Sequence, residues 1–152
     1  MEKVIHTIHK GFIGEIAVIK DLVSNYTNYN VFKPIIDEKG VDLIVERRKK
    51  EFLRVQVKTI TEMRTKTSIE VRLHKYRNKD LIDIVAVYYA EKDLVCYVPY
   101  ENENSINLAL KPSKNNQMKN RRFFYQYQVN AVKIINICCK YIMSQVFSYF
   151  AK

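Results

Sequence analysis

The chain has 152 residues, 47% of them hydrophobic, and a formal net charge of +10 at pH 7. This length and apolar content predict one globular domain with a substantial core and exclude a chain that stays disordered. A small domain this basic favours a polyanionic partner, usually nucleic acid and less often an anionic membrane surface; the alternative is a basic protein without such a partner.

Cysteine usage and the two ends of the chain predict an intracellular protein. Cys96, Cys138 and Cys139 form no disulfide framework, because the count is odd and adjacent cysteines on a helix do not easily bridge each other. The N-terminal residues lack the apolar segment of a signal peptide. The apolar C-terminal run carries Lys133 and Lys140, so it lacks the charge-free length of a membrane span. We therefore expect a cytoplasmic protein without a membrane partner.

A first helix is predicted over residues 9–25, with a carboxylate on its buried side. On a helical wheel, the side centred on Glu15 carries apolar residues, namely Val18, Ile19 and Leu22, widened by Phe12, Ile16 and Val23. The opposite side is expected to face solvent and carries Lys10, Ala17, Lys20, Asp21 and Ser24. A buried Glu needs a partner or stays protonated. Two interpretations remain open: Glu15 belongs to a site, or the helix macrodipole favours it near the helix start.

Residues 40–58 predict a β-hairpin. Two runs of alternating apolar and polar residues flank a charged turn at residues 47–50. On the second arm, Gln56 and Lys58 point to the same side. On the first arm, Asp42 lies in an apolar run, where a carboxylate is costly to bury unless something binds it. If the arms pair, Asp42, Gln56 and Lys58 converge on one face, and nearby Gly40 suits a crowded site or serves simply in a turn.

The other elements complete a sheet and a second helix. A strand over residues 30–36 contains Pro34, which indicates a sheet edge or a strand end. Further strands are predicted over residues 68–73, 82–89, 94–100 and 106–110, with a charged loop at 74–80. The run at 82–89 is nearly continuously β-prone, so we expect a central strand there. A long helix over about residues 126–150 has an apolar face wide enough to indicate an oligomer interface, in a dimer or tetramer.

Basic side chains gather in segments that we expect to contact double-stranded DNA. The loop of about residues 111–122 has no acid and interleaves cations with Asn and Gln, a composition suited to phosphates and base edges; the alternative is a solvated loop. The predicted DNA contacts are Arg47, Arg48, Lys49, Lys50, Arg64, Lys66, Arg72, Lys75, Arg77, Lys111, Lys114, Lys119, Arg121 and Arg122.

The cluster on the hairpin is suited to phosphodiester hydrolysis with Mg²⁺ or Mn²⁺. Mg²⁺ prefers oxygen ligands and keeps several waters, so one carboxylate, an amide and a backbone carbonyl suffice. Asp42 is the expected anchoring ligand, with the amide oxygen of Gln56 and the carbonyl of Val57. Lys58 holds or activates the attacking water, or offsets developing charge. Glu15 completes the catalytic group directly or through water.

Three segments resemble the PD-(D/E)XK nuclease superfamily: Gly11-Phe-Ile-Gly-Glu15, Gly40-Val-Asp42 and Val55-Gln56-Val-Lys58. The resemblance implies an α/β fold of the α+β type, with a helix, a mixed β-sheet and a long C-terminal helix around a restriction-endonuclease-like core. It implies one nuclease domain over residues 1–152, with its core at about residues 9–100. Two positions depart from the pattern, since Val41 replaces a proline and Gln56 replaces an acid.

The Gln-X-Lys form is similar to that of bacterial homing endonucleases of this class, encoded within group I introns. Residues 83–88 and 94–99 also look similar to that family, which implies an oligomer that cuts both strands of a long DNA target. The alternatives are a Holliday junction resolvase, a restriction-type nuclease, a non-catalytic DNA-binding module on a degenerate nuclease fold, and a structural protein of unrelated fold.

Overall fold

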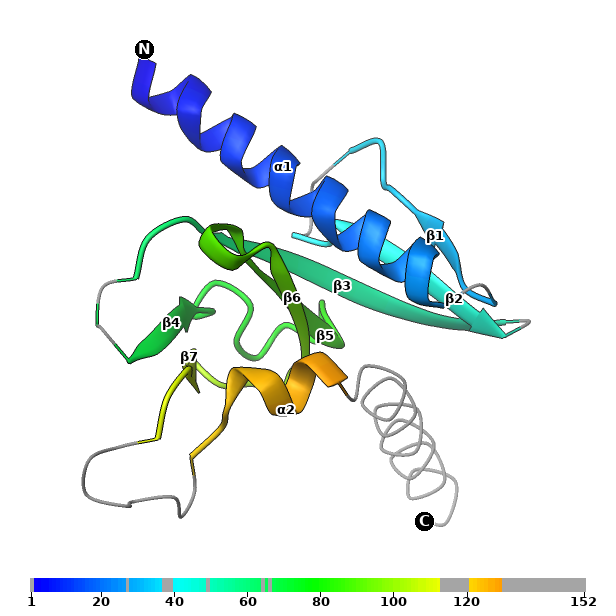
Figure 1. The fold of residues 1–152 in the computed structure, drawn as a ribbon. Helices are drawn as coiled ribbons and strands as arrows, with labels where there is room; N and C mark the ends of the chain where they lie inside the picture. Colours follow the sequence, from blue (N-terminus) through cyan, green and yellow to red (C-terminus); the bar gives the residue numbers. More distant parts are fainter. Residues whose placement is uncertain are drawn as a thin grey trace.

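The computed structural model describes residues 2–26, 28–36, 40–48, 50–63, 65, 67–112 and 121–129. A helix begins and a helix ends this part of the chain, and the strands lie between them (Figure 1). In chain order they are α1 (Glu2–Asn25), β1 (Asn30–Phe32), β2 (Leu43–Arg48), β3 (Glu51–Ile60), β4 (Ser68–Arg72), β5 (Ile84–Tyr89), the 3-10 helix η1 (Ala90–Lys92), β6 (Leu94–Pro99), β7 (Ser105–Ala109) and α2 (Phe124–Val129).

One mixed sheet has five strands in the order β1-β2-β3-β5-β6. The predicted hairpin is confirmed: β2 and β3 pair antiparallel, with Leu43 opposite Val55. β3 and β5 run parallel, with Gln56 beside Val85, and β6 returns antiparallel along β5. β5 is buried at every position, as expected for a strand inside the sheet.

Two apolar layers cover the two faces of this sheet. Side chains alternate along β3, so Val55 and Val57 point to one face and Gln56 and Lys58 point to the other. The first face packs against α1. The second face packs against β4, β7, α2 and the loop of residues 73–82. Figure 1 shows α1 and the β4–β7 pair on opposite sides of β3. The polar residues of the hairpin therefore lie on the face that α1 does not cover.

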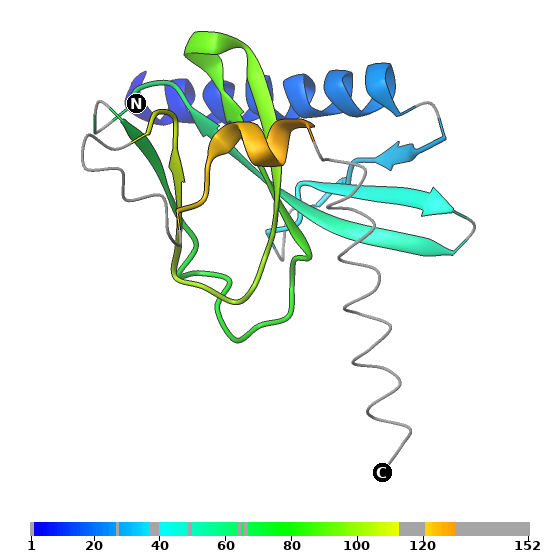
Figure 2. The same cartoon turned by 60° about the horizontal axis from the view of Figure 1, so that its bottom comes forward.

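β4 and β7 form a separate antiparallel sheet of two strands, which was not predicted. Ile69 and Leu108 pair in its buried side, whereas Glu70 and Asn107 pair on its exposed side. Figure 2 shows the β2–β3 hairpin (cyan) extending away from this small sheet. The sequence pattern gave each strand its period, but it carried no signal for which strands share a sheet.

The buried face of α1 differs from the predicted face. Val18 and Leu22 are buried as predicted. Phe12, Ile16 and Val23 were predicted to widen the buried stripe, but they are 53%, 49% and 57% exposed. The prediction for these three residues was wrong because the helical wheel placed the buried face by the positions of apolar side chains alone.

Gly14 explains how α1 is rotated on the sheet. A Cβ added at Gly14 would overlap Oγ1 of Thr59 on β3, so the helix backbone lies directly against the Thr59 side chain at this point. This approach turns two residues from the predicted solvent side toward the sheet. Ala17 packs against the first core layer, and Asp21 accepts a 2.6 Å hydrogen bond from the hydroxyl of Tyr97.

Several predicted boundaries were also wrong. α1 begins at Glu2 rather than near residue 9, because residues 2–8 contain neither glycine nor proline. β1 ends at Phe32, since Pro34 has no backbone N–H to donate. β5 begins at Ile84 rather than at residue 82, although the backbone of Asp83 still donates to the carbonyl of Arg54 and accepts from the N–H of Tyr100.

α2 is described from Phe124 to Val129. The remainder of the helix predicted over residues 126–150 lies outside the described residues. Among the helices of the described residues, none is long and apolar enough to cross a membrane.

Candidate active site

The hairpin register brings Asp42 beside the second arm of the hairpin. Asp42 directly precedes β2, and its backbone N–H donates to the carbonyl of Val55 at 3.0 Å. Its carboxylate oxygen Oδ2 accepts a 2.6 Å hydrogen bond from the backbone N–H of Val57. The carboxylate is therefore fixed by the backbone of β3 rather than by a flexible side chain, which orients it before any ligand arrives.

Gln56 joins Asp42 on the same face of the hairpin, as predicted. Its side chain is only 4% exposed. The amide nitrogen Nε2 donates to Oδ2 of Asp42 and, at 3.0 Å, to the carbonyl oxygen of Val57. The amide oxygen Oε1 is buried and has no hydrogen-bond partner among the described residues. An unpaired buried oxygen is costly and points to a ligand that it would bind.

Lys58 lies two residues further along β3, and Tyr76 contacts it. The ammonium Nζ donates to the Tyr76 hydroxyl at 3.3 Å and lies 5.1 Å from the centroid of the same ring. Tyr76 is 9% exposed and comes from the loop between β4 and β5. Sequence reasoning placed Tyr76 only in a charged loop. A single large aromatic residue among charged neighbours is the signal that would have marked it as buried.

Gly40 gives the site the space it needs. Its φ is +69°, a conformation that L side chains rarely adopt. A Cβ added there would overlap Cε1 of the Tyr76 ring and lie 3.3 Å from Oε1 of Gln56. The interpretation of Gly40 as a residue that permits close approach is therefore confirmed.

Glu15 lies apart from this group in the described contacts. Its side chain is partly buried, at 19% exposed, and forms an ion pair with Lys33. α1 packs against the face of β3 that carries Val57, opposite to the Lys58 side. No contact of Glu15 with Asp42, Gln56 or Lys58 is found among the described residues. Its assignment to the catalytic group remains a prediction.

A comparison with protein families identifies the family of this chain. A family model described as PD-(D/E)XK endonuclease matches residues 5–130. The chain belongs to this family. The family membership is thereby confirmed, as is the predicted fold class of a helix and a mixed β-sheet, whereas the long C-terminal helix lies outside the described residues.

The solved structures that are similar to this PD-(D/E)XK endonuclease include that of a bacterial homing endonuclease, I-Ssp6803I, with a TM-score of 0.64 and 21% sequence identity. The match covers 89% of this chain and 95% of that chain. At this identity the likeness establishes the fold. A search of curated protein sequences found no match.

The oxygen atoms around Asp42 fit the divalent metal ion that PD-(D/E)XK nucleases generally use. Asp42 Oδ2 and the carbonyl oxygen of Val57 both accept hydrogen bonds from Nε2 of Gln56. Turning the amide by half a rotation would present Oε1, now without a partner, to the same place. Within the described ranges, no group of three or more His, Cys, Asp or Glu side chains could hold a metal. The fit therefore depends on one carboxylate, an amide and a backbone carbonyl, a ligand set that suits a hard cation such as Mg²⁺.

Arg54 shares the face of Gln56 but is occupied by acids. Its guanidinium forms ion pairs with Asp83 at 2.8 Å and Asp80 at 3.1 Å. The hydrogen bonds that Arg54 donates to Asp83 raise the pKa of Arg54, although burial opposes this shift. Arg54 therefore links β3 to the start of β5 and contributes to the scaffold beneath the site.

The predicted DNA-contacting residues of this PD-(D/E)XK endonuclease fall into different groups. Three arginines pair with carboxylates: Arg47 with Glu51 (2.8 Å), Arg72 with Glu70 (3.9 Å), and Arg122 with Glu101 (2.9 Å) and Glu103. Three lysines are exposed and form no ion pair among the described residues: Lys50, Lys75 and Lys111. Arg77 is exposed and donates to the side-chain oxygen of Asn104 at 3.4 Å. Lys49, Arg64, Lys66, Lys114 and Lys119 lie outside the described residues, as does the side chain of Arg48.

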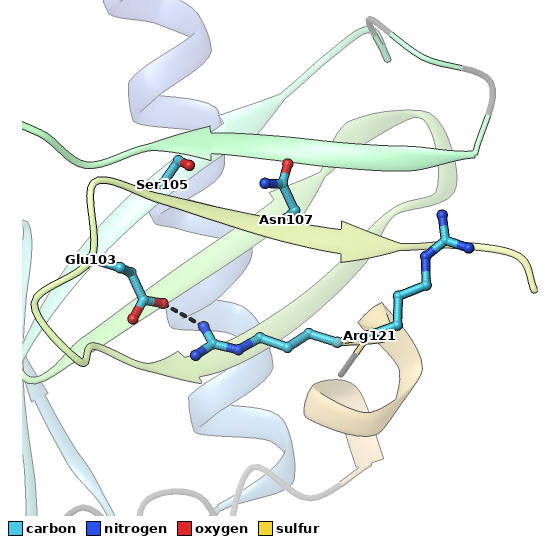
Figure 3. A pocket seen from close by; sticks show the side chains of 5 residues that line it. Glu103, Ser105, Asn107 and Arg121 are labelled. Carbon is cyan, nitrogen blue, oxygen red and sulfur yellow. Dashed lines mark hydrogen bonds and ion pairs between the residues drawn. The ribbon is translucent and has the colours of Figure 1, made fainter. Parts of the chain in front are cut away.

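Arg121 and Arg122 border a shallow hollow of about 300 Å³ on the small sheet. Figure 3 shows Ser105 and Asn107 of β7 at this hollow, with Glu103 bound to an arginine, which is Arg122. The hollow contains neither Asp42 nor Lys58. It is therefore a surface feature separate from the candidate active site.

Proposed function

We propose that this protein is a Mg²⁺-dependent, sequence-specific DNA endonuclease that acts as a homing endonuclease. The observation that carries the proposal is the Asp42–Gln56–Val57 oxygen set on the hairpin, with Lys58 on the same face, in a chain of the PD-(D/E)XK endonuclease family. The family implies a DNA substrate. We take residues 1–152 as one nuclease domain.

Each residue of the group has a separate task in hydrolysis. A bound divalent cation supplies a Lewis acid for the phosphate and lowers the pKa of a bound water. Asp42, Gln56 and the Val57 carbonyl would hold it, and the backbone N–H of Val57 keeps the Asp42 carboxylate oriented. Lys58 donates hydrogen bonds to the attacking water or to the phosphate oxygens, which offsets the charge that develops in the transition state.

The homing assignment rests on the residue at the third motif position and on the similar structure. Gln56 supplies a neutral ligand where the family pattern has an acid. The neighbour I-Ssp6803I is described as a bacterial homing endonuclease, and its fold covers most of this chain. A Holliday junction resolvase and a restriction-type nuclease are the alternatives within the family.

Cleavage of DNA by the purified chain tests the proposal. We expect nicking or cutting with Mg²⁺ or Mn²⁺, and none with EDTA. Asp42→Ala and Lys58→Ala should abolish cleavage but keep DNA binding, because phosphate contacts dominate affinity. Lys92→Ala is the matched control, since Lys92 is exposed on η1, away from the hairpin. Cleavage that survives both active-site substitutions would contradict the proposal.

A mixed panel of DNA substrates separates the alternatives. A randomised library of long duplex sites should yield one preferred site for a homing enzyme, whereas four-way junctions should be preferred by a resolvase. If the chain binds DNA with no detectable divalent binding and no cleavage, it is the non-catalytic module.

Self-association is part of the proposal, because cutting both strands of a duplex needs two active sites. Exposed apolar residues on α1 support it: Ile8 is 64% exposed and Ile13 55%, in addition to Phe12, Ile16 and Val23. Sedimentation of the wild type and of Phe12→Ser tests this surface. A wild-type monomer at micromolar concentration would contradict the expected oligomer.

A further inference from the structure

Tyr76 contacts the ammonium of Lys58 in two ways. Its hydroxyl accepts a hydrogen bond from Nζ at 3.3 Å, and its ring centroid lies 5.1 Å from the same atom. A lysine carries its charge on a flexible four-carbon stem, so the free side chain samples many rotamers. Two contacts from one rigid ring restrict where the charge lies, and a cation at this distance from an aromatic face is attracted to it.

Tyr76 is itself fixed by its surroundings. It is 9% exposed and belongs to the second core layer. Its backbone N–H donates to the carbonyl of Leu73 at 2.9 Å, and its carbonyl accepts from Lys79 at 3.3 Å. The ring also occupies the space that a side chain at Gly40 would need. The backbone hydrogen bonds of Tyr76 and the packing of its ring edge against Gly40 therefore restrict its position.

The loop that carries Tyr76 is attached to the segment before β7. The side chains of Asn78 and Asn102 bond to each other at 2.8 Å, and the Asn102 oxygen also accepts from the Asn78 backbone at 2.6 Å. The backbone N–H of Leu73 donates to the carbonyl of Asn104 at 2.7 Å. These bonds connect the position of Tyr76 to the small sheet.

We propose that Tyr76 is a positioning residue for Lys58, whose hydroxyl and ring hold the ammonium on the Asp42–Gln56 side of the hairpin. This inference rests on the proposed function, because it assigns to Lys58 the role given there. The ammonium acts on charge that develops only in the transition state, and an ordered ammonium loses no rotamer freedom at that point, so the benefit falls on the cleavage step rather than on DNA binding. Tyr76 acts through Lys58 and need not touch the DNA.

Two substitutions separate the hydroxyl from the ring. Tyr76→Phe keeps the ring and removes the hydroxyl, and we expect the single-turnover cleavage rate to fall about three- to tenfold with unchanged DNA affinity. Tyr76→Leu removes both contacts, and a larger loss is expected. Tyr100→Phe is the matched control, because Tyr100 packs against the same core layer and its buried hydroxyl has no hydrogen-bond partner among the described residues.

A double-mutant cycle distinguishes positioning from a merely structural role. In a Lys58→Ala background, Tyr76→Phe should cause no further loss of rate, since its target is gone. The same fold-loss in both backgrounds would overturn the inference, as would full activity of a folded Tyr76→Leu. If Lys58→Ala alone cleaves at the wild-type rate, the proposed function fails instead, which is a separate result.

A metal-free NMR measurement covers the case in which Lys58→Ala has no measurable rate. The Lys58 ε-methylene protons should show nuclear Overhauser cross-peaks to the ring protons of Tyr76, because the ammonium lies 3.3 Å from the hydroxyl of that ring. We expect these cross-peaks in the wild type. Their absence in the folded wild type would overturn the inference.

Discussion

Replacement of Gln56 by Glu tests the arrangement of the candidate active site most directly. Nε2 of Gln56 donates to both the carboxylate of Asp42 and the carbonyl of Val57. The substitution keeps the size of the side chain but replaces a double donor with an acceptor. Without a cation, two carboxylates and a carbonyl would then face one another.

The size of the effect follows from this contact. Two like charges about 4 Å apart repel by roughly 4 kcal/mol at an effective dielectric constant of about 20. Protonation limits the cost, because at pH 7 adding a proton to a carboxyl group with an ordinary pKa of about 4.3 costs roughly 3.7 kcal/mol. We therefore expect Gln56→Glu to lower the free energy of unfolding by about 2–4 kcal/mol at pH 7 in EDTA.

The pH dependence has a definite sign. The neighbouring carboxylate of Asp42 raises the pKa of the introduced group in the folded state. The introduced carboxyl group therefore loses its proton at a lower pH in the unfolded state than in the folded state. The loss of unfolding free energy caused by Gln56→Glu grows as the pH rises above about 4.3 and should be near 1 kcal/mol at pH 5. Mg²⁺ should restore stability, because the added charge strengthens metal binding and ligand binding to the folded state stabilises it.

Urea unfolding at pH 5 and pH 7, with EDTA and with increasing Mg²⁺, measures these effects. Asn28→Asp is the control, since it adds the same charge at an exposed position in the turn between α1 and β1 and should change stability by less than about 0.5 kcal/mol. If Gln56→Glu is as stable as the wild type in EDTA at pH 7, the amide nitrogen does not face Asp42 and the interpretation of the site is refuted.

The remaining predictions concern the scaffold and the DNA surface. Gly40→Ala should lower the free energy of unfolding by about 1–3 kcal/mol, because φ is +69° and the ring of a neighbour fills the space; an unchanged urea midpoint would contradict this. Burial raises the pKa of Tyr97, so its contribution to stability is complete below about pH 10 and is lost at higher pH; Tyr97→Phe should show a smaller alkaline loss in urea unfolding at pH 8 and pH 11. Lys111→Ala should weaken DNA binding and reduce the salt slope by about 1, whereas Arg122→Ala, which loses its ion pair with Glu103, should leave that slope nearly unchanged in a filter-binding titration.

The hairpin was predictable because its determinants are local. The alternation of apolar and polar residues sets which side chains share a face, and a short turn sets the register. With Leu43 opposite Val55, Asp42 lies opposite Gln56, and its carboxylate reaches the backbone N–H of Val57. The convergence of Asp42 and Gln56 could therefore be derived from spacing alone.

The rotation of α1 could not be derived in this way. A helical wheel weighs side chains by hydrophobicity, but the contact that fixes this helix is made where a side chain is missing, at Gly14 against Thr59. The sheet also leaves Phe12 and Ile16 exposed, although both are strongly apolar. An apolar stripe on a helix predicts that this surface is buried. It does not indicate whether the same chain or a second copy of it buries the surface.

The contact between Tyr76 and Lys58 could not be predicted from local sequence patterns. It approaches Lys58 from 18 residues away, through a loop held by backbone and asparagine bonds, and no periodicity connects them. Gly40 is the sequence feature that could have joined the two segments, because its positive φ and missing side chain indicate that another part of the chain comes close. A side chain that packs against Gly40, beside the proposed ligand Gln56, can fill space, hold a reacting group, or do both. The hydroxyl and the ring of Tyr76 both reach the Lys58 ammonium, so in this active site the same residue fills the space and holds the charge.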